Sequence, residues 1–429
     1  MKSYFILVLL LSFSLPIQLS AQQHNLDFYL EEAKANSTFI HQNRNEKQLV
    51  RLDMEQIRKI YSKPEVTVDA SVLFAPIISN DGGSGKFQLV TKDATDYTGY
   101  DLAVTDGGQY QGVVSLNQGL FNGRKIDTYN SKAEIQQQIH DNNIQLTEHE
   151  LENAVKHQYL LCLKSTRQAN NNLELAREVS NEISIMKELV RNAIYKQSDL
   201  KLLEIARQNY EQAYETFYAE YRDNVYNLNL LCGINEGADA EIEPVEFSLN
   251  REKVDNSKFL TSFYLDSLAI IADRQISELK YLPQVNLFAN AGMNAVHLPA
   301  FNRFGFSTGA TFSLTLFDGQ QRKIEFEKSM INLENIQFNK QQTMIQTEIQ
   351  KNFTLDKLRS LDKRIHLADN QLEQYDQLLS MYKSQLGQGT LSVMDYSYLL
   401  KDISEKKQER LLFEMEKQMV INAYNYWNY

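Results

Sequence analysis

The chain has few residues that break helices. It contains 17 glycines and six prolines among 429 residues, whereas an average chain has about 7% glycine and about 5% proline. A sequence so poor in turn residues cannot be a string of compact domains built from short elements. We therefore expect long, uninterrupted helices over much of the chain.

Long apolar runs, cysteines and excess basic charge are also missing. No run of 18 apolar residues follows residue 21, which excludes a membrane-spanning helix and leaves β-strands as the means of crossing a bilayer. Two cysteines exclude a disulfide-dense scaffold and a four-cysteine zinc site. The net charge of −11 argues against nucleic acid as a partner, because phosphate attracts clustered Lys and Arg.

Residues 1–21 have the features of a signal peptide. Lys2 supplies the positive charge, residues 4–17 the apolar stretch, and Leu19–Ala21 a cleavage site of small residues. No cysteine follows this site, which argues against a lipoprotein signal. We expect the mature chain to begin at residue 22 outside the cytoplasm.

Three landmarks occur twice in the same order: a Pro-x-Val-x-aliphatic-x-Ala segment, a Leu-Phe-Asn/Asp-Gly segment, and an aspartate 76 residues after the last glycine. They stand at Pro64–Ala70 and Pro283–Ala289, at Leu120–Gly123 and Leu316–Gly319, and at Asp199 and Asp395. This order indicates an internal duplication, with one repeat in residues 22–250 and the other in residues 251–429.

Within the glycine- and proline-rich clusters the apolar residues alternate with polar ones, which predicts strands. The expected strands are residues 64–76, 110–121, 285–295 and 306–317. A soluble sandwich has the same alternation, but a signal peptide and the lack of other sheet-forming sequence favour transmembrane strands. Because about eight strands are needed to close a barrel and lipid does not tolerate open edges, two or three copies must pool their strands.

The segments outside these clusters carry heptad seams, for example Ile365, Ala368, Leu372, Tyr375 and Leu379. This spacing predicts coiled-coil packing. Each repeat then contains a helical hairpin, with tips near residues 191–198 and 386–392. Arms that turn near residue 197 place Cys162 and Cys232 at one height, so either a disulfide or two buried free thiols can result.

No catalytic motif is complete. Residues 82–86 (Gly-Gly-Ser-Gly-Lys) lack the Ser or Thr that follows the lysine of a phosphate loop. His149-Glu150 lacks the second histidine of a zinc protease helix, and we expect His140, His149 and His157 to be solvated surface residues. We expect no enzyme activity, no cofactor and no metal site.

The repeated landmarks resemble the TolC family of outer-membrane efflux proteins, over essentially the whole mature chain. The resemblance implies a mixed α+β membrane protein that works as a homotrimer: four strands per chain close a 12-stranded barrel, and long coiled-coil hairpins form a helical tunnel across the periplasm. It implies outer-membrane lipid, a periplasmic adaptor (membrane fusion) protein and an inner-membrane transporter as partners. The adaptor would dock at the hairpin tips, at Ala193, Ile194, Gly387, Gln388, Gly389 and Thr390.

Asp199 and Asp395 follow the two tips at equal positions, where a carboxylate can cap a helix. In a trimer, three copies of Asp395 would also form an acidic ring, and we expect Asp395 and Asp199 at the pore constriction. Asp395 matches the first of two ring aspartates in relatives, whereas Tyr398 replaces the second and Leu391 replaces the arginine that locks the closed state. Arg191 or Lys383 could supply the missing link.

The sequence therefore predicts the outer-membrane duct of a tripartite efflux or secretion system. The alternative is a trimeric coiled-coil surface stalk or adhesin, which also pools membrane strands between chains. In that class the strands are contiguous at the C-terminus, whereas here they are split between two repeats. This split favours the duct.

Overall fold

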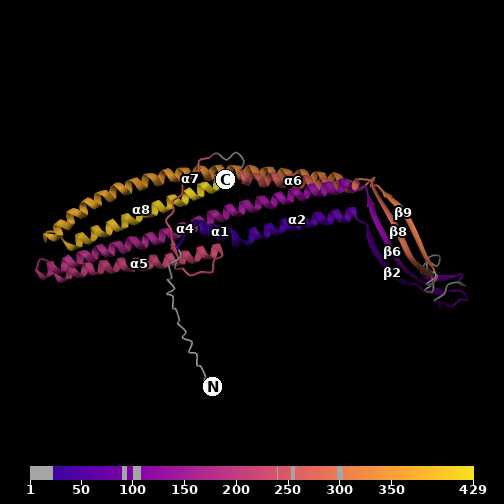
Figure 1. Ribbon diagram of the computed structural model, residues 1–429, viewed down its shortest axis with the longest axis horizontal. Helices are drawn as coiled ribbons and strands as arrows, with labels where there is room; N and C mark the ends of the chain where they lie inside the picture. Colours follow the sequence, from indigo (N-terminus) through magenta and orange to yellow (C-terminus); the bar gives the residue numbers. More distant parts are fainter. Residues whose placement is uncertain (1–22, 89–93, 100–107, 239, 253–256, 297–302) are drawn as a thin grey trace, which may run out of the picture. The chain divides into compact units, whose positions relative to one another are not determined.

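The computed structural model describes residues 23–88, 94–99, 108–238, 240–252, 257–296 and 303–429. The predicted signal peptide and parts of both predicted interstrand loops lie outside these residues. Most of the described chain is helical (Figure 1). The helices are α1 (Leu26–Asn36), α2 (Thr38–Ser62), α4 (Gly123–Arg191), α5 (Gln197–Cys232), α6 (Lys258–Glu278), the 3-10 turn η1 (Leu279–Tyr281), α7 (Gln321–Gly387) and α8 (Val393–Trp427).

The helices α4 and α7 are unusually long. They contain 69 and 67 residues, which at 1.5 Å per residue correspond to about 100 Å each. Neither helix contains a proline, and α4 has no glycine after its first residue. Because backbone-breaking residues are missing, nothing interrupts the hydrogen-bonded ladder over this length.

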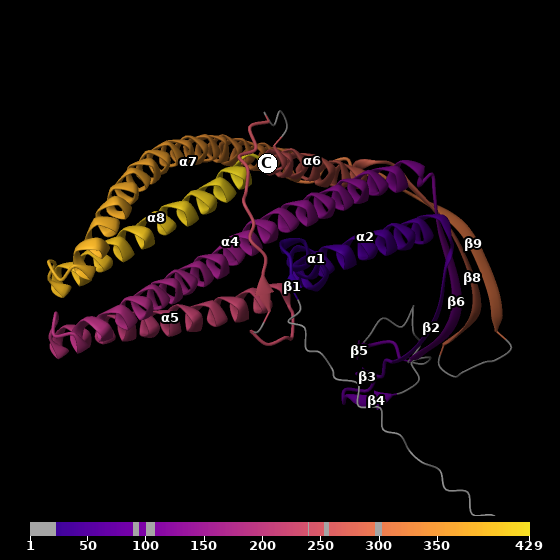
Figure 2. The ribbon, with the colours of Figure 1, turned by 60° about the vertical axis from the view of Figure 1, so that its left-hand side comes forward.

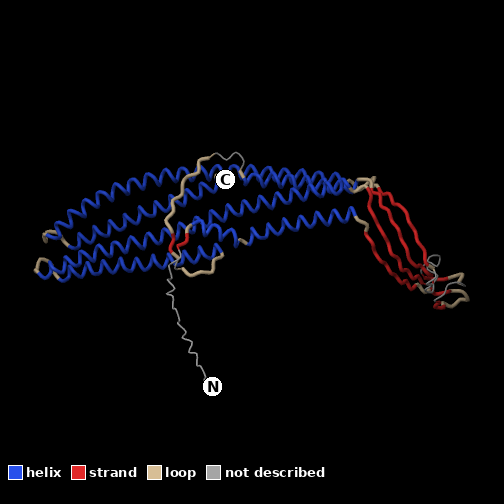
Figure 3. The backbone as a smooth tube through the Cα atoms, in the orientation of Figure 1, coloured by secondary structure: helices blue, strands red, loops and turns tan. Residues whose placement is uncertain are grey.

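The described residues form two compact units, and each takes segments from both halves of the sequence. The helical unit comprises residues 23–41, 145–257 and 345–429, and the sheet unit comprises residues 42–144 and 258–344. These units therefore do not coincide with the two sequence repeats. Each repeat gives two long strands to the sheet unit and most of a helical hairpin to the helical unit, as the sequence colours of Figure 1 and the helices and strands of Figure 3 show.

Four long strands form one antiparallel sheet in the order β2-β6-β8-β9 (Figure 2). They are β2 (Glu65–Phe74), β6 (Gly108–Leu120), β8 (Gln284–Val296) and β9 (Phe304–Ser313). Three short strands, β3 (Ile77–Ser79), β4 (Lys86–Gln88) and β5 (Tyr97–Gly99), form a small separate sheet, and β1 (Gln23–His24) pairs with β7 (Glu241–Ile242) in the helical unit.

Two of the expected strands end two or more residues earlier than predicted, and two begin two residues earlier, at Gly108 and Phe304. The strand expected at residues 64–76 ends at Phe74, and the strand expected at residues 306–317 ends at Ser313. Ser313 pairs with Gln284, the first residue of β8. The residue before β8 is Pro283, which has no N–H to donate, so the ladder does not continue along Leu314–Phe317.

The repeated Leu-Phe-Asn/Asp-Gly landmark ties each strand end to the preceding helix–strand junction. Asn122 donates its amide to the carbonyl oxygens of Tyr61 and Gly119, both at 2.9 Å. Asp318 accepts hydrogen bonds from the Tyr281 hydroxyl and from the backbone N–H of Arg322, the latter at 2.9 Å. The third position of the landmark thus fixes the place where sheet becomes helix in both repeats.

The helical unit is held by buried seams of apolar side chains. One cluster joins α4, α5 and α8 near the tips and contains Val179, Ile183, Met186, Leu203 and Leu400. Val179, Ile183 and Met186 follow one another at heptad spacing along α4. The seams are the reason why the hairpins stay closed over many turns.

A second cluster lies under the segment that joins the two repeats. Tyr159 of α4 donates its hydroxyl to the carbonyl of Glu243 at 2.8 Å, and Tyr221 of α5 donates to the carbonyl of Ala240 at 2.5 Å. Phe247 packs against the same cluster. The linker is therefore an ordered strap across the helices and not a loose connection.

His149 corrects the expectation of solvated histidines. Its ring stacks against Tyr426 and Tyr429, with centroid distances of 5.0 and 3.8 Å. Its Nε2 lies 2.9 Å from the carbonyl oxygen of Tyr426. Burial lowers the pKa of His149 below its usual range, because a desolvated imidazolium is unfavourable.

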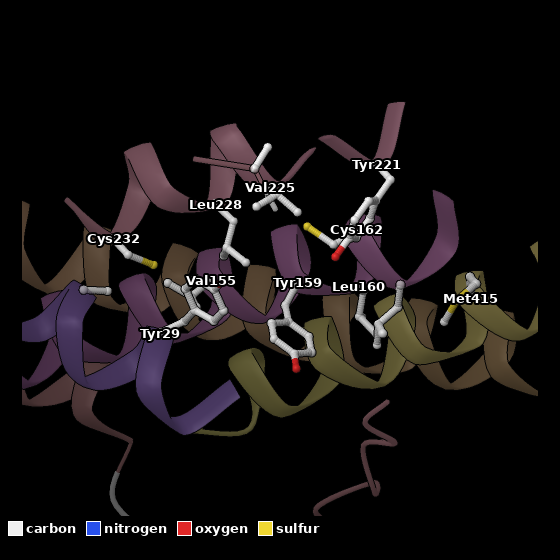
Figure 4. Close-up of a cluster of buried hydrophobic side chains, with 13 residues drawn as sticks. Tyr29, Val155, Tyr159, Leu160, Cys162, Tyr221, Val225, Leu228, Cys232 and Met415 are labelled. Atoms are coloured by element: carbon white, nitrogen blue, oxygen red, sulfur yellow. The ribbon is translucent and has the colours of Figure 1, made fainter. Parts of the chain in front are cut away.

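Cys162 and Cys232 are both free and fully buried in one apolar cluster (Figure 4). They are not level: Asn224 of α5 bonds to Gln158 and Ser165 of α4, so Cys162 faces the turn around residue 224. Cys232 lies eight residues further along α5, or about 12 Å at 1.5 Å per residue. A disulfide needs Cα atoms within about 7 Å, so the disulfide alternative is wrong.

The expectation that the two cysteines lie at one height was wrong because the hairpin turns at a different residue. The sequence placed the turn near residue 197, whereas α4 ends at Arg191 and α5 begins at Gln197. The hairpin thus turns about three residues earlier than expected. A given residue of α4 therefore lies opposite a residue of α5 that is about six positions earlier than expected. The cysteines are consequently separated by two helical turns.

We predict that neither cysteine reacts with a thiol reagent at pH 8 in the folded protein. Both side chains are 0% exposed, and burial raises the pKa of each thiol to about 12, so the reactive thiolate is scarce. After denaturation without reductant, two thiols should react per chain. Thiols that react in the denatured chain only after reduction would contradict the assignment of two free cysteines.

The same pKa shifts give a pH dependence. Because the folded pKa exceeds the unfolded value near 8.5, ionisation above that pH favours the unfolded chain. The contribution of the two neutral thiols to the free energy of unfolding should be complete below about pH 8.5 and decline as the pH rises towards 12. Denaturant midpoints measured between pH 8 and 11 should fall less steeply in the Cys162→Ala, Cys232→Ala double variant.

Candidate functional site

Each helical hairpin turns through five residues, 192–196 in the first hairpin and 388–392 in the second. At the first tip, the N–H of Ile194 donates to the carbonyl of Leu189 at 2.9 Å, and the N–H of Ala193 donates to Val190 at 3.0 Å. This pair of bonds is the Schellman motif, which satisfies the last carbonyl groups of a helix.

The second tip repeats this geometry at equivalent positions. The N–H of Thr390 donates to the carbonyl of Gln385 at 3.0 Å, and the N–H of Gly389 donates to Leu386 at 3.1 Å. Both motifs need a residue with positive φ after the helix end. Gly389 has φ 74°, whereas the first repeat uses Ala193 at φ 56°, a conformation that costs a non-glycine residue about 1–2 kcal/mol.

The two tips are in direct contact. A Cβ atom added to Gly389 would lie 2.5 Å from the Cγ2 atom of Ile194, so only glycine admits the isoleucine at this distance. The hydroxyl of Tyr195 lies 2.7 Å from the carbonyl oxygen of Leu391 and 3.2 Å from that of Leu386. The tips therefore act as one surface.

The residues expected to dock an adaptor all lie at this joined tip. Ile194 and Gly389 touch each other, as described. All six of these residues are exposed: Ala193, Ile194, Gly387, Gln388, Gly389 and Thr390. The structure thus gathers them into one accessible surface, and their role as a docking site stays a prediction.

Asp199 and Asp395 occupy equal sequence positions but have different surroundings. The carboxylate of Asp199 accepts a hydrogen bond from the N–H of Lys196 at 2.9 Å, while the N–H of Asp199 donates to the Lys196 carbonyl at 3.0 Å. This reciprocal pair caps the start of α5. Asp199 therefore has a structural task that explains its presence.

Asp395 does not share that task. At the start of α8 the capping oxygen belongs to Ser392, whose hydroxyl accepts from the N–H of Met394 at 3.2 Å. Asp395 is exposed, and it makes no hydrogen bond or ion pair within the described residues. Its carboxylate is thus available to solvent, ions or another chain.

Of the two residues that could replace the missing arginine, only Lys383 joins the hairpins. Arg191 pairs with Glu188 on its own helix. Lys383 of α7 lies 3.5 Å from the carboxylate of Glu182 on α4. Glu182 is buried and adjoins Tyr396 of α8, whose pKa is raised by burial and further by this carboxylate.

Tyr195 and Glu182 were not predicted from the sequence. Glu182 directly precedes Ile183 of an apolar heptad seam, and a charged residue next to a buried seam is a signal in the sequence. Tyr195 stands inside the predicted tip, but its bond to the other hairpin depends on three-dimensional packing. A pattern along one repeat does not reveal that contact.

The register of the sheet sorts the side chains into two chemically different faces. Apolar residues share one face, where directly paired residues of neighbouring strands lie together. They are Val66, Val68, Ala70, Val72 and Phe74 of β2; Tyr110, Val114 and Leu116 of β6; Val285, Leu287, Ala289, Ala291 and Met293 of β8; and Phe304, Phe306, Ala310 and Phe312 of β9.

Most of this apolar face is not covered by other described parts of the chain. Val68 is 76% exposed and Phe306 is 85% exposed. The opposite face is mostly polar, with Glu65, Thr67, Asp69, Ser71, Gln111, Ser115, Asn117, Asn286, Asn290, Asn294, Ser307 and Thr311. A sheet in water buries its apolar face, so the arrangement here is inverted relative to a soluble domain.

The polar face is also hollowed. A cavity of about 690 Å³ lies at the end of the sheet that adjoins the helices, and Asn117, Asn286 and Thr311 are among its lining residues. A second cavity of about 610 Å³ lies nearer the other end and is lined by Asp69, Ser71 and Asn294, among others. Both offer amide, hydroxyl and charged groups to a solvated space.

The described chain contains no group of three or more His, Cys, Asp or Glu residues placed to hold a metal ion. The Gly-Gly-Ser-Gly-Lys segment forms the turn between β3 and β4, and Lys86 begins a strand instead of a helix.

Among the helices in the described ranges, none is both long enough and apolar enough to cross a membrane.

No family model and no curated protein sequence matches the chain. Solved outer-membrane channels do match it in structure. The CusC channel has a TM-score of 0.69 at 11% identity, over 94% of this chain and 91% of its own. The outer membrane protein VceC from Vibrio cholerae has a TM-score of 0.68 at 13% identity, over 94% and 95%.

The CmeC outer membrane channel of Campylobacter jejuni is similar to the same extent, with a TM-score of 0.68 at 12% identity over 94% of this chain and 85% of its own. At such low identities the similarity establishes the fold alone. The chain has the fold of outer-membrane channels, which confirms at this level the resemblance predicted from the repeated landmarks.

Proposed function

We propose that the chain is a subunit of an outer-membrane duct that carries solutes from the periplasm to the exterior. The observation that carries this proposal is the four-stranded sheet, with an exposed apolar face and a hollowed polar face. An apolar face of this kind suits lipid, and a polar face suits a water-filled lumen. The long hairpins would extend from this sheet into the periplasm.

Three copies would complete the barrel. Within the described residues β2 and β9 each pair with one strand only, so both edges present free backbone groups. Lipid does not tolerate such edges. If β9 of one copy pairs with β2 of the next, three copies supply twelve strands and close the ring, as the trimeric fold predicted from the sequence requires.

The helices beside these edges support the same closure. On α7, which follows β9, four apolar residues spaced by seven are 47–63% exposed: Ile324, Ile331, Phe338 and Ile345. On α2, which leads into β2, Leu49, Leu52 and Ile60 are 51–61% exposed. A neighbouring copy would cover these stripes, since a heptad seam exposed to water is unfavourable.

At the other end, the joined tips would receive a periplasmic adaptor tied to an inner-membrane transporter. The three copies of Asp395 would form an acidic ring around the axis, near Asp199. The Lys383–Glu182 pair and the Tyr195 bond hold the two hairpins of one chain together, and we propose that they replace the missing arginine in keeping the duct closed. This part of the proposal rests on the fold and on the contacts described above.

A surface stalk is the competing function. It requires strands that are contiguous at one end of the chain, whereas the central strands β6 and β8 come from different repeats. A stalk would not conduct ions. Pore formation therefore separates the two functions.

A matched pair of substitutions on β6 tests which face meets lipid. Val114 lies on the apolar face and Ser115 on the polar face. Val114→Lys should disfavour insertion by roughly 2–4 kcal/mol near the bilayer centre and reduce the protein recovered in outer membranes. Ser115→Lys should insert normally and form pores in planar bilayers. Equal recovery of both variants, or unimpaired Val114→Lys, would argue against a lipid-facing sheet.

A second matched pair tests the acidic ring. Asp395→Ala should weaken block by multivalent cations added on the periplasmic side, because it removes three adjacent charges. Asp199→Ala should leave block nearly unchanged and cost about 1 kcal/mol of local helix stability, visible as faster amide exchange at the start of α5. Unchanged cation block in single-channel recordings of Asp395→Ala would show that Asp395 does not lie at the constriction.

A further inference from the structure

The cavity at the helical end of the sheet has an unusual charge balance for this acidic chain. Three lysines line it: Lys63 before β2, Lys125 in the first turn of α4, and Lys280 in η1. Glu65 is the one carboxylate among its described lining residues. The remaining polar lining consists largely of neutral amides and hydroxyls.

Two of the lysines are positioned by aromatic rings. The ammonium group of Lys125 lies 5.5 Å from the centroid of Tyr61, and that of Lys280 lies 5.0 Å from the centroid of Tyr281. Cation–π contacts at this distance hold a lysine without neutralising it. Tyr61 also stacks against Tyr129, with centroids 5.8 Å apart, so the support is itself fixed.

The location of Lys125 gives a second, independent indication. The first turn of α4 contains Arg124 and Lys125 and no acidic residue. Cations are unfavourable at a helix N-terminus because the helix dipole already places positive charge there. The start of α4 therefore adds to the positive potential of the cavity, which a bound anion would relieve.

The acidic groups nearby do not cancel this potential. Glu278 pairs with Arg322. A hydrogen bond with Tyr281 raises the pKa of Lys280, and attraction to Asp318 and Glu325 raises it further, but neither carboxylate lines the cavity. Lys63 makes no ion pair within the described residues. The neutral amide of Asn122 completes the wall beside Lys125 and is anchored to the Tyr61 carbonyl.

We propose that this cavity is a binding site for small multivalent oxyanions, such as solutes that carry several phosphate or carboxylate groups. A volume of about 690 Å³ admits a molecule of that size. Under the proposed function, on which this inference rests, the three copies would form a belt of nine lysines at the inner mouth of the barrel. The belt would concentrate anionic cargo after it has left the tunnel.

Sodium tripolyphosphate is a suitable probe, titrated calorimetrically into the full-length protein in mild detergent. The protein should bind it, and the triple variant Lys63→Gln, Lys125→Gln, Lys280→Gln should bind at least about tenfold more weakly, since several charge-assisted contacts are lost. The triple variant with arginine at the same positions should retain binding. Retention with arginine separates loss of charge from loss of folding.

The matched control removes three surface lysines that lie outside the cavity: Lys59→Gln, Lys323→Gln and Lys328→Gln. Each is already paired with a glutamate on its own helix, so binding should be unchanged. No binding by the unmodified protein, or equal weakening in both glutamine triples, would overturn the proposal.

A recording in planar bilayers distinguishes this inference from the proposed function. Tripolyphosphate added on the extracellular side should block single channels of the unmodified protein and much less those of the cavity triple. Pores that are insensitive to tripolyphosphate would reject the anion site and leave the duct intact. Calorimetric binding without any pore would support the anion site and reject the duct.

Discussion

The structure depends on one constraint: every backbone polar group in a sheet must find a partner, and lipid offers none. The four strands satisfy this requirement among themselves except along β2 and β9. Under the proposed function the exposed apolar face meets lipid, so water cannot pair with the free edges. The exposed apolar stripes on α2 and α7 accompany the same two edges, and the neighbouring copy that we propose would cover both.

The tips are held by a different kind of order. Both hairpins end in the same Schellman motif, and the glycine of one motif makes room for the isoleucine of the other. Tyr195 then ties the hairpins through backbone carbonyls, which a substitution in the second hairpin would not easily remove. The two tips are similar, as the predicted duplication requires, but Asp199 caps its helix whereas Asp395 is accessible.

Much of this fold could be predicted from the sequence, because it depends on local signals. Glycine and proline positions, the period of two in the strands and the heptad seams each report on neighbouring residues. The errors concern relations between distant segments. Pro283 ends β9 early although it precedes another strand, β8, and the early turn after Arg191 separates the two cysteines. Likewise, Ser392 caps α8 in place of Asp395, whereas Asp199 caps α5, and only the structure reveals this difference.

The most direct test of the account is the contact between β9 of one copy and β2 of the next. Thr67 of β2 and Thr311 of β9 both lie on the polar face, and each is the third residue from the helical end of its strand. Cysteines at both positions, treated with bifunctional thiol reagents in membranes, should give covalent products that end at three chains. The native cysteines are buried and should not contribute. Products confined to one chain, or a series that stops at two or continues beyond three, would contradict a duct closed by three copies.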